Sequence, residues 1–127
     1  MSEAPLRLVG LRGATTCSAK TTTDIRQAVR ELIDLLVSRN GISPEQIVSV
    51  TFSVTADLDA CFPAAEARQR NGWDSVALLD CQQMAVQGDL CRCIRVLAHV
   101  WLPPEQSPQH PYLGEASRLR PDRSGHN

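Results

Sequence analysis

The feature that most limits the fold of this chain is one long amphipathic helix, predicted from residue 24 to residue 39. Its apolar residues recur at intervals of three and four, which places them on one helical face. They are Ile25, Ala28, Val29, Leu32, Ile33 and Leu36. The threonines at 21–23 are candidate N-caps, and Asn40-Gly41 is a typical C-terminal stop. A helix with a single apolar face must cover a second apolar surface.

Predicted strands supply that surface. Residues 48–55 and 93–101 alternate apolar with polar side chains, which is typical of a strand with one buried face. Further strands are predicted over 6–14, over 75–79 (short and buried) and over 115–120, with a second helix over 63–69. The order β-α-β-α-β-β-β predicts an α+β (mixed α/β) fold, in which helices cover one face of a mixed sheet. We expect residues 1–127 to form one domain, with a mobile polar tail over 121–127.

Charge and composition exclude several classes of protein. The 127 residues carry 13 cations and 14 anions, a net charge of −1, so no basic excess suggests nucleic-acid binding. No apolar run reaches the roughly 18–20 residues needed to span a bilayer, and no secretory signal opens the chain. We therefore expect a cytoplasmic protein without a nucleic-acid or membrane partner.

The cysteines predict neither a disulfide framework nor a metal site. Their number, five, is odd, and suits a reducing compartment. Cys91 and Cys93 form a lone C-x-C pair without the second pair or nearby histidine that a zinc site needs. Motifs for phosphate binding, metal hydrolysis or a serine nucleophile are missing as well. We expect chemistry that needs no cofactor.

Arginine is the residue type that stands out. The chain has 12 arginines and one lysine, Lys20, and composition bias alone accounts for most of them. Arg12, Arg95 and Arg120, however, lie at strand ends or between apolar strand residues, where an unpartnered charge is costly to bury. Two interpretations remain open at this point. Either these strands have a solvated face, or the arginine forks bind a small polyanion.

Several blocks of this sequence resemble the AroH class of chorismate mutases. The most specific are R-G-A-T-T at residues 12–16, D-L-x-A-x-F-P-A at 57–64 and C-I-R-V at 93–96. Gly72-Trp73, Tyr112-Leu113 and Leu119-Arg120-Pro121-Asp122 accompany them. The blocks occur in the family order and cover roughly residues 8 to 122.

The resemblance implies a homotrimer that forms a pseudo-α/β-barrel, with active sites between subunits. It also implies an isomerase of phenylalanine and tyrosine biosynthesis, which converts chorismate to prephenate by an intramolecular Claisen rearrangement. One C–O bond breaks while one C–C bond forms, and neither a nucleophile nor a metal is needed. This agrees with the missing motifs, and a substrate with two carboxylates agrees with the arginines.

The resemblance further implies roles for individual residues. Arg95 meets the ether oxygen of the substrate and its enolpyruvyl carboxylate, and Arg12 binds that carboxylate with the hydroxyl of Tyr112. The other implied site residues are Phe62 as an apolar wall, Ala64 as a lining residue, Leu79 with its backbone at the ring hydroxyl, and Arg68 and Arg120 as cations at the site mouth.

Three positions depart from the family pattern. Gln83 stands where the family commonly has a glutamate, Asp80 where it commonly has a cysteine, and Ala65 where it has a lysine. We expect the missing anion to have moved: Asp80 accepts from the ring hydroxyl and pairs with Arg95, and Gln83 supports it by hydrogen bonding. Asp80→Asn should then lower turnover far more than Gln83→Ala. The alternative for Asp80 is a simple cap or turn residue after a strand.

Three other functions stay open. One is a trimer that binds chorismate for regulation, without catalysis, because the glutamate is lost. The second is a deaminase-type relative with the same trimeric barrel, and the third is an interaction module. The C-I-R-V block and Tyr112 favour the mutase over the second, and Asp80 argues against the first.

Overall fold

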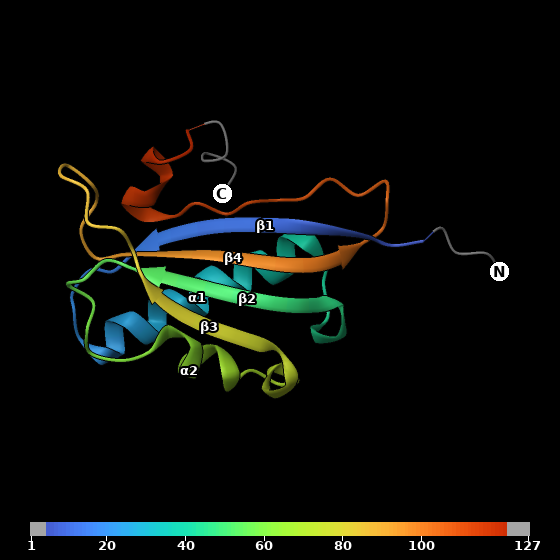
Figure 1. Cartoon of the computed structure of the whole chain (residues 1–127), viewed down its shortest axis with the longest axis horizontal. Coiled ribbons are helices and arrows are strands. Elements are labelled where there is room, and N and C mark those ends of the chain that lie inside the picture. The colour runs from blue at the N-terminus through green and yellow to red at the C-terminus, as the bar shows by residue number, and fades with distance from the viewer. Residues whose placement is uncertain (1–4, 122–127) are drawn as a thin grey trace.

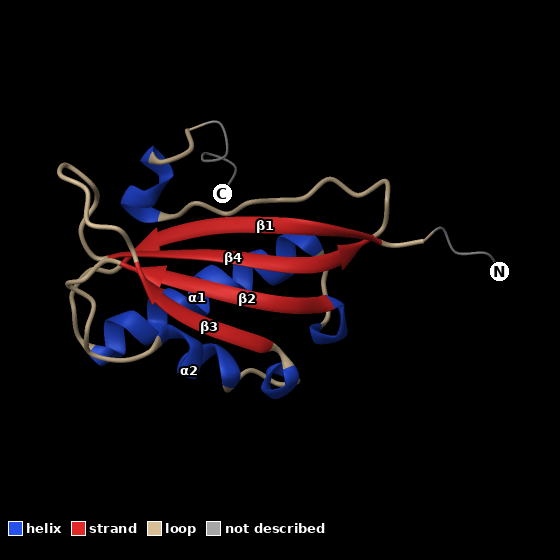
Figure 2. Ribbon diagram, viewed as in Figure 1, coloured by secondary structure: helices blue, strands red, loops and turns tan. Residues whose placement is uncertain are grey.

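A computed structural model describes residues 5–121, in which two helices cover one face of a four-stranded sheet (Figures 1 and 2). The strands are β1 (Arg7–Thr16), β2 (Ile47–Val54), β3 (Ala77–Gln82) and β4 (Cys93–Leu102), and the helices are α1 (Thr22–Asn40) and α2 (Pro63–Arg68). Short 3-10 helices occur at Pro44–Gln46, Trp73–Ser75 and Gly114–Arg118. The predicted α+β class with a mixed sheet is confirmed.

The strands lie in the order β1-β4-β2-β3. β4 runs antiparallel to both β1 and β2, whereas β3 runs parallel to β2. A parallel pair needs a crossover connection, and α2 is the helix in the one between β2 and β3. β1 and β3 are therefore the two edges of the sheet.

Both ends of α1 are closed as its sequence predicts. The Thr21 side chain accepts from the Asp24 backbone N–H at 3.2 Å, and Gly41 ends the helix in the left-handed conformation, with φ of 60°. The predicted apolar face is buried in full. The helix is thus placed by its caps and held by one stripe of side chains.

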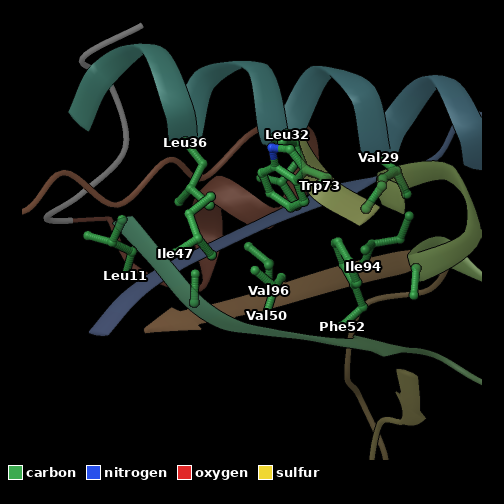
Figure 3. Close-up of a cluster of buried hydrophobic side chains, with 14 of the residues drawn as sticks. Leu11, Val29, Leu32, Leu36, Ile47, Val50, Phe52, Trp73, Ile94 and Val96 are labelled. Carbon is green, nitrogen blue, oxygen red and sulfur yellow. The ribbon is translucent and has the colours of Figure 1, made fainter. Parts of the chain in front are cut away.

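The core lies between α1 and the inner face of the sheet (Figure 3). Ile94 and Val96 of β4 and Phe52 of β2 pack there with Leu32 and are at most 3% exposed. Successive residues of a strand point to opposite faces, so their neighbours in these strands face outward. Neither α1 nor α2 covers that outer face in Figure 2; the 3-10 helix Gly114–Arg118 packs against one end of it.

Two predicted strands differ from the structure. Residues 115–120 do not form a strand; a 3-10 helix, Gly114–Arg118, lies there instead. Its apolar residues Ala116 and Leu119 are three positions apart, which is a helical spacing, and both pack beside Ala14. The strand predicted as buried over 75–79 is the edge strand β3, and most of its residues are exposed. Residues 122–127 of the predicted tail lie outside the described residues.

The close approach at Gly13 gives a test of the fold. A β-carbon there would lie 2.7 Å from the carbonyl oxygen of Pro111 and 3.3 Å from Leu32 Cδ1. We expect Gly13→Ala to lower the free energy of unfolding by about 1–3 kcal/mol, because backbone and core must shift. Urea denaturation followed by circular dichroism measures this. Gly10→Ala is the matched control, since its β-carbon would make only an ordinary 3.7 Å contact with Leu97. Equal midpoints for the two variants would contradict the argument.

Candidate functional site

Four of the predicted site residues surround one small hollow, which we call the arginine pocket. Its volume is about 170 Å³, and its walls include Arg12, Arg95, Tyr112 and Arg120. In the β1–β4 ladder Arg12 lies opposite Leu97, and Ala14 lies opposite Arg95. The two arginines are therefore diagonal neighbours on the outer face of the sheet. The arrangement gathers positive charge in a partly enclosed space.

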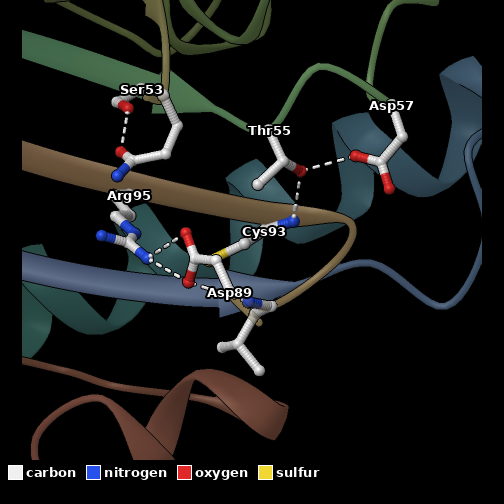
Figure 4. A network of polar contacts seen from close by, with 8 residues as sticks. Ser53, Thr55, Asp57, Asp89, Cys93 and Arg95 are labelled. Atoms are coloured by element: carbon white, nitrogen blue, oxygen red, sulfur yellow. Dashed lines mark hydrogen bonds and ion pairs between the residues drawn. The ribbon is translucent and has the colours of Figure 1, made fainter. Parts of the chain in front are cut away.

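The Arg95 guanidinium is half-enclosed and has one acidic partner among residues 5–121. Its Nη2 lies 3.1 Å from Oδ1 and 3.2 Å from Oδ2 of Asp89 (Figure 4). Its Nε is buried without a hydrogen-bond partner. A buried donor without a hydrogen-bond partner is costly.

Tyr112 is held in the pocket wall by backbone bonds to β1. Ala14 N–H donates to the Pro111 carbonyl at 3.0 Å, and Leu113 N–H donates to the Ala14 carbonyl at 2.8 Å. Tyr112 itself is only 3% exposed. The Arg12 backbone N–H donates to His110 Nδ1 at 3.0 Å, a support that the sequence did not indicate.

A second hollow, of about 430 Å³, lies at the β3 edge of the sheet; we call it the Phe62 pocket. Phe62, Pro63 and Asp80 line it, and Phe62 is 72% exposed. Ala64 lies beside it in the first turn of α2, where its N–H donates to Asp80 Oδ1 at 3.0 Å. Burial raises the pKa of Asp80, and the Ala64 hydrogen bond and the charge of Arg68 act against this rise.

Within one chain Asp80 does not pair with Arg95. Asp80 lies opposite Phe52 in the sheet, on the face toward the helices. Arg95 lies opposite Ser53, on the other face. Asp80 instead caps the N-terminus of α2, where Phe62 provides no side-chain cap. This is the alternative that the sequence left open for Asp80.

Gln83 does not support Asp80 either. Its Oε1 accepts from the Ser53 hydroxyl at 2.7 Å, on the outer face of the sheet. The carboxylate beside Arg95 belongs to Asp89, a contact that was not predicted from the sequence. Asp89 lies in an irregular loop, where no periodicity assigns a face. A Gly-Asp turn pair six residues before a strand arginine is too common to have indicated it.

The remaining predicted residues are scattered. Arg68 ends α2, and Leu79 is 62% exposed at the β3 edge, and neither lines the arginine pocket or the Phe62 pocket. Gln83 lines a third hollow, of about 320 Å³, together with Asp89. The predicted site residues therefore line separate hollows and do not surround one cavity within the chain.

Further groups bear on the chemistry. Burial raises the pKa of the Cys17 thiol to about 11 and raises that of Cys93, so both stay protonated at neutral pH. Within residues 5–121 no cluster of three or more His, Cys, Asp or Glu residues could hold a metal ion. None of the helices described is long and apolar enough to cross a membrane.

Comparisons with known proteins agree with these features. The chorismate mutase type I family model matches residues 8–123. The chain is 39% identical over 116 residues to chorismate mutase AroH of Bacillus subtilis (strain 168), covering 91% of each chain. It is 47% identical over 116 residues to chorismate mutase AroH of Thermus thermophilus, covering 89% of this chain and 93% of the relative.

The fold is also similar to that of a solved chorismate mutase. The solved structure of a chorismate mutase from Clostridium thermocellum superposes with a TM-score of 0.81 at 38% identity, covering 87% of this chain and 99% of that one. Sequence blocks, arginine pocket and fold therefore lead to one conclusion: this chain belongs to the type I, AroH-class chorismate mutase family.

Proposed function

We propose that this protein is an isomerase that converts chorismate to prephenate in the biosynthesis of aromatic amino acids. The observation that carries the proposal is the pair of arginines on the outer sheet face, with Arg95 Nε buried and unpartnered. A dicarboxylate with an ether oxygen supplies the acceptors that such a pocket lacks. We further propose that the protein acts in the cytoplasm, which its five free cysteines support.

The rearrangement needs orientation and charge stabilisation. The substrate must be held in a compact conformer in which the two reacting carbons meet, and binding within a shaped pocket provides this. As the C–O bond stretches, negative charge develops on the ether oxygen. A cation already fixed beside that oxygen stabilises the transition state more than the ground state. No step requires a nucleophile, a metal or a cofactor.

Each pocket residue has a part in this scheme. Arg95 meets the ether oxygen through the guanidinium edge that Asp89 does not occupy. Arg12 and the Tyr112 hydroxyl bind the enolpyruvyl carboxylate, and Arg120 attracts the anionic substrate at the rim. The half-enclosed position of Arg95 supports this assignment, because a fixed charge is most effective where little water screens it.

We propose that the complete site forms between copies of the chain. The arginine pocket lies at the β1–β4 side of the sheet, and the Phe62 pocket lies at the opposite β3 edge. When two different surfaces join head to tail, the copies form a closed ring if the rotation between neighbours allows it. A homotrimer with a barrel-like arrangement of sheets is such a ring. The outer sheet face supports it further, because Leu8, Leu97 and Trp101 are 39% to 51% exposed there.

In this arrangement the Phe62 pocket of one copy covers the arginine pocket of the next. Phe62 packs on the substrate as an apolar wall, with Ala64 beside it. Asp80 Oδ2 is free to accept from the ring hydroxyl, because Ala64 occupies Oδ1. The Leu79 backbone meets the same hydroxyl, Gln83 contributes a neutral amide, and Arg68 steers the substrate's entry.

Replacing Arg95 tests the catalytic assignment. Arg95→Lys keeps a positive charge but loses the planar fork, so we expect kcat to fall about 100- to 1,000-fold, as for a lost oxyanion donor. Chorismate consumption followed by absorbance measures this. Arg118→Lys is the control, since Arg118 is exposed. Unchanged kcat in Arg95→Lys would refute the assignment, and chorismate binding without turnover by the unaltered protein would instead support the regulatory trimer.

Subunit complementation tests the composite site. Arg95→Ala removes the cation of one half-site, and Phe62→Asp puts an anion into the other, so each variant alone should be inactive. In a ring of three that contains both variants, one of the three interfaces joins two intact halves. We expect co-expressed, doubly tagged trimers to recover about a third of the normal activity. No recovery in such mixed trimers would place the whole site within one chain.

The role proposed for Asp80 predicts how kcat/KM depends on pH. Because its pKa is raised, its carboxylate takes up a proton at a higher pH than the ordinary value of about 3.9. If the carboxylate accepts the ring hydroxyl, kcat/KM should decline as the pH falls through that raised pKa. Asp80→Asn should lower kcat/KM and remove this acid limb, whereas Gln83→Ala should retain it. Identical pH profiles in the two variants would contradict the role proposed for Asp80.

A further inference from the structure

We infer that Asp89 is the positioning residue for Arg95, and that it supplies the carboxylate that was expected at Asp80. The inference rests on the proposed function, because it concerns how the reacting cation is held. Asp89 does not touch the substrate in this scheme. It acts through Arg95.

The contact itself is specific. Both Asp89 oxygens lie within 3.2 Å of one guanidinium nitrogen, Nη2, and Nε has no hydrogen-bond partner. The side chains are only 25% (Arg95) and 21% (Asp89) exposed, so water and salt screen the pair less than a surface ion pair. A carboxylate on one edge of the fork therefore determines the direction in which the other donors point.

Contacts within its own loop also fix the position of Asp89. Gly88 adopts a backbone φ of 87°, which residues with a side chain rarely adopt. The Asp89 N–H donates to the Val86 carbonyl at 3.1 Å. The Leu90 N–H donates to Asp89 Oδ1 at 2.8 Å. The carboxylate is thus fixed by a turn and by the following backbone N–H group before it meets Arg95.

The loop is also attached to the walls of the arginine pocket. Leu90 packs against the cluster that contains Ala14, Cys93 and Tyr112. Beyond it, the Arg92 backbone N–H donates to the Asp57 carboxylate. Cys93 N–H donates to the Thr55 hydroxyl at 3.0 Å (Figure 4). These contacts place Asp89 relative to the same strands that carry Arg95.

The other candidates for this role are excluded by position or by charge. Asp80 lies on the opposite face of its own chain's sheet, and in the proposed composite site the Asp80 of the next copy is engaged by the ring hydroxyl. Gln83 is neutral and already accepts from Ser53. Ser53 is opposite Arg95 in the sheet, and Gln83 and Asp89 line the same hollow. A carboxylate at position 83 would therefore also lie beside the guanidinium, so one anion at either position should suffice.

Comparing kcat with KM shows whether Asp89 positions Arg95 for catalysis or only stabilises the pocket. Binding a substrate carboxylate tolerates some rotation of a guanidinium, whereas contact with the ether oxygen in the transition state does not. We expect Asp89→Asn to lower kcat about 10- to 100-fold, as is typical when the partner that orients a functional group is removed, with KM changed less than about threefold. Adding Gln83→Glu to Asp89→Asn should restore kcat to within about threefold of the unaltered protein. These are steady-state measurements on the full chain.

Asp34→Asn is the matched control. It breaks another Asp–Arg ion pair, with Arg70 at 2.7 Å, outside the three hollows. It should leave kcat unchanged. Unchanged or increased kcat in Asp89→Asn would overturn the inference, and so would a loss that Gln83→Glu does not restore.

A readout without turnover separates this inference from the proposed function. In ¹H–¹⁵N spectra of the unliganded protein, Asp89→Asn should shift and broaden the Arg95 Nε–H signal, and the added Gln83→Glu should sharpen it again. If the unaltered protein does not consume chorismate, the proposed function fails while these spectra still decide the pairing. An Arg95 signal insensitive to Asp89→Asn would overturn the inference.

Discussion

The site depends on the apolar contact between α1 and the inner face of the sheet. Ile94 and Val96 are buried beneath that helix, and strand geometry then turns Arg95, which lies between them, to the opposite face. The pairing of β1 with β4 brings Arg12 to the same side. Formation of the core and placement of the Arg95 guanidinium are therefore one event. A one-residue change of register would move both arginines into the core.

Electrostatics within the arginine pocket follow from its partial burial. A guanidinium stays charged in any protein environment, so it requires a partner as water is withdrawn. Asp89 meets this requirement at one edge only, and the Nε donor remains unsatisfied. The pocket thus holds unused binding capacity, and an anionic substrate can use it. An ion pair on both edges would have been more stable but would have closed the cation to substrate.

The two pockets lie at opposite edges of the sheet, which has a physical consequence for the proposed assembly. The Phe62 pocket exposes an aromatic ring at one edge, and the arginine pocket lies near the other. In a ring of copies each interface would cover apolar surface on the outer sheet face and complete one site. Stability and activity would then share an interface, and a lone chain would have neither in full.

The sequence by itself determined the helices, the position of β4 and the mixed sheet, because periodicity and caps are local properties of the chain. The resemblance, which is also carried by local blocks of sequence, identified the arginines and Phe62 as candidate site residues. It did not predict the 3-10 helix at Gly114–Arg118, where a two-residue alternation was assigned to a segment with helical spacing. Only the tertiary structure decided which carboxylate meets Arg95. Asp80 and Asp89 both precede Arg95 in the chain, and strand register and loop path put one on each side of the sheet. Which face a side chain occupies depends on pairing between distant segments, and no single stretch of sequence contains that information.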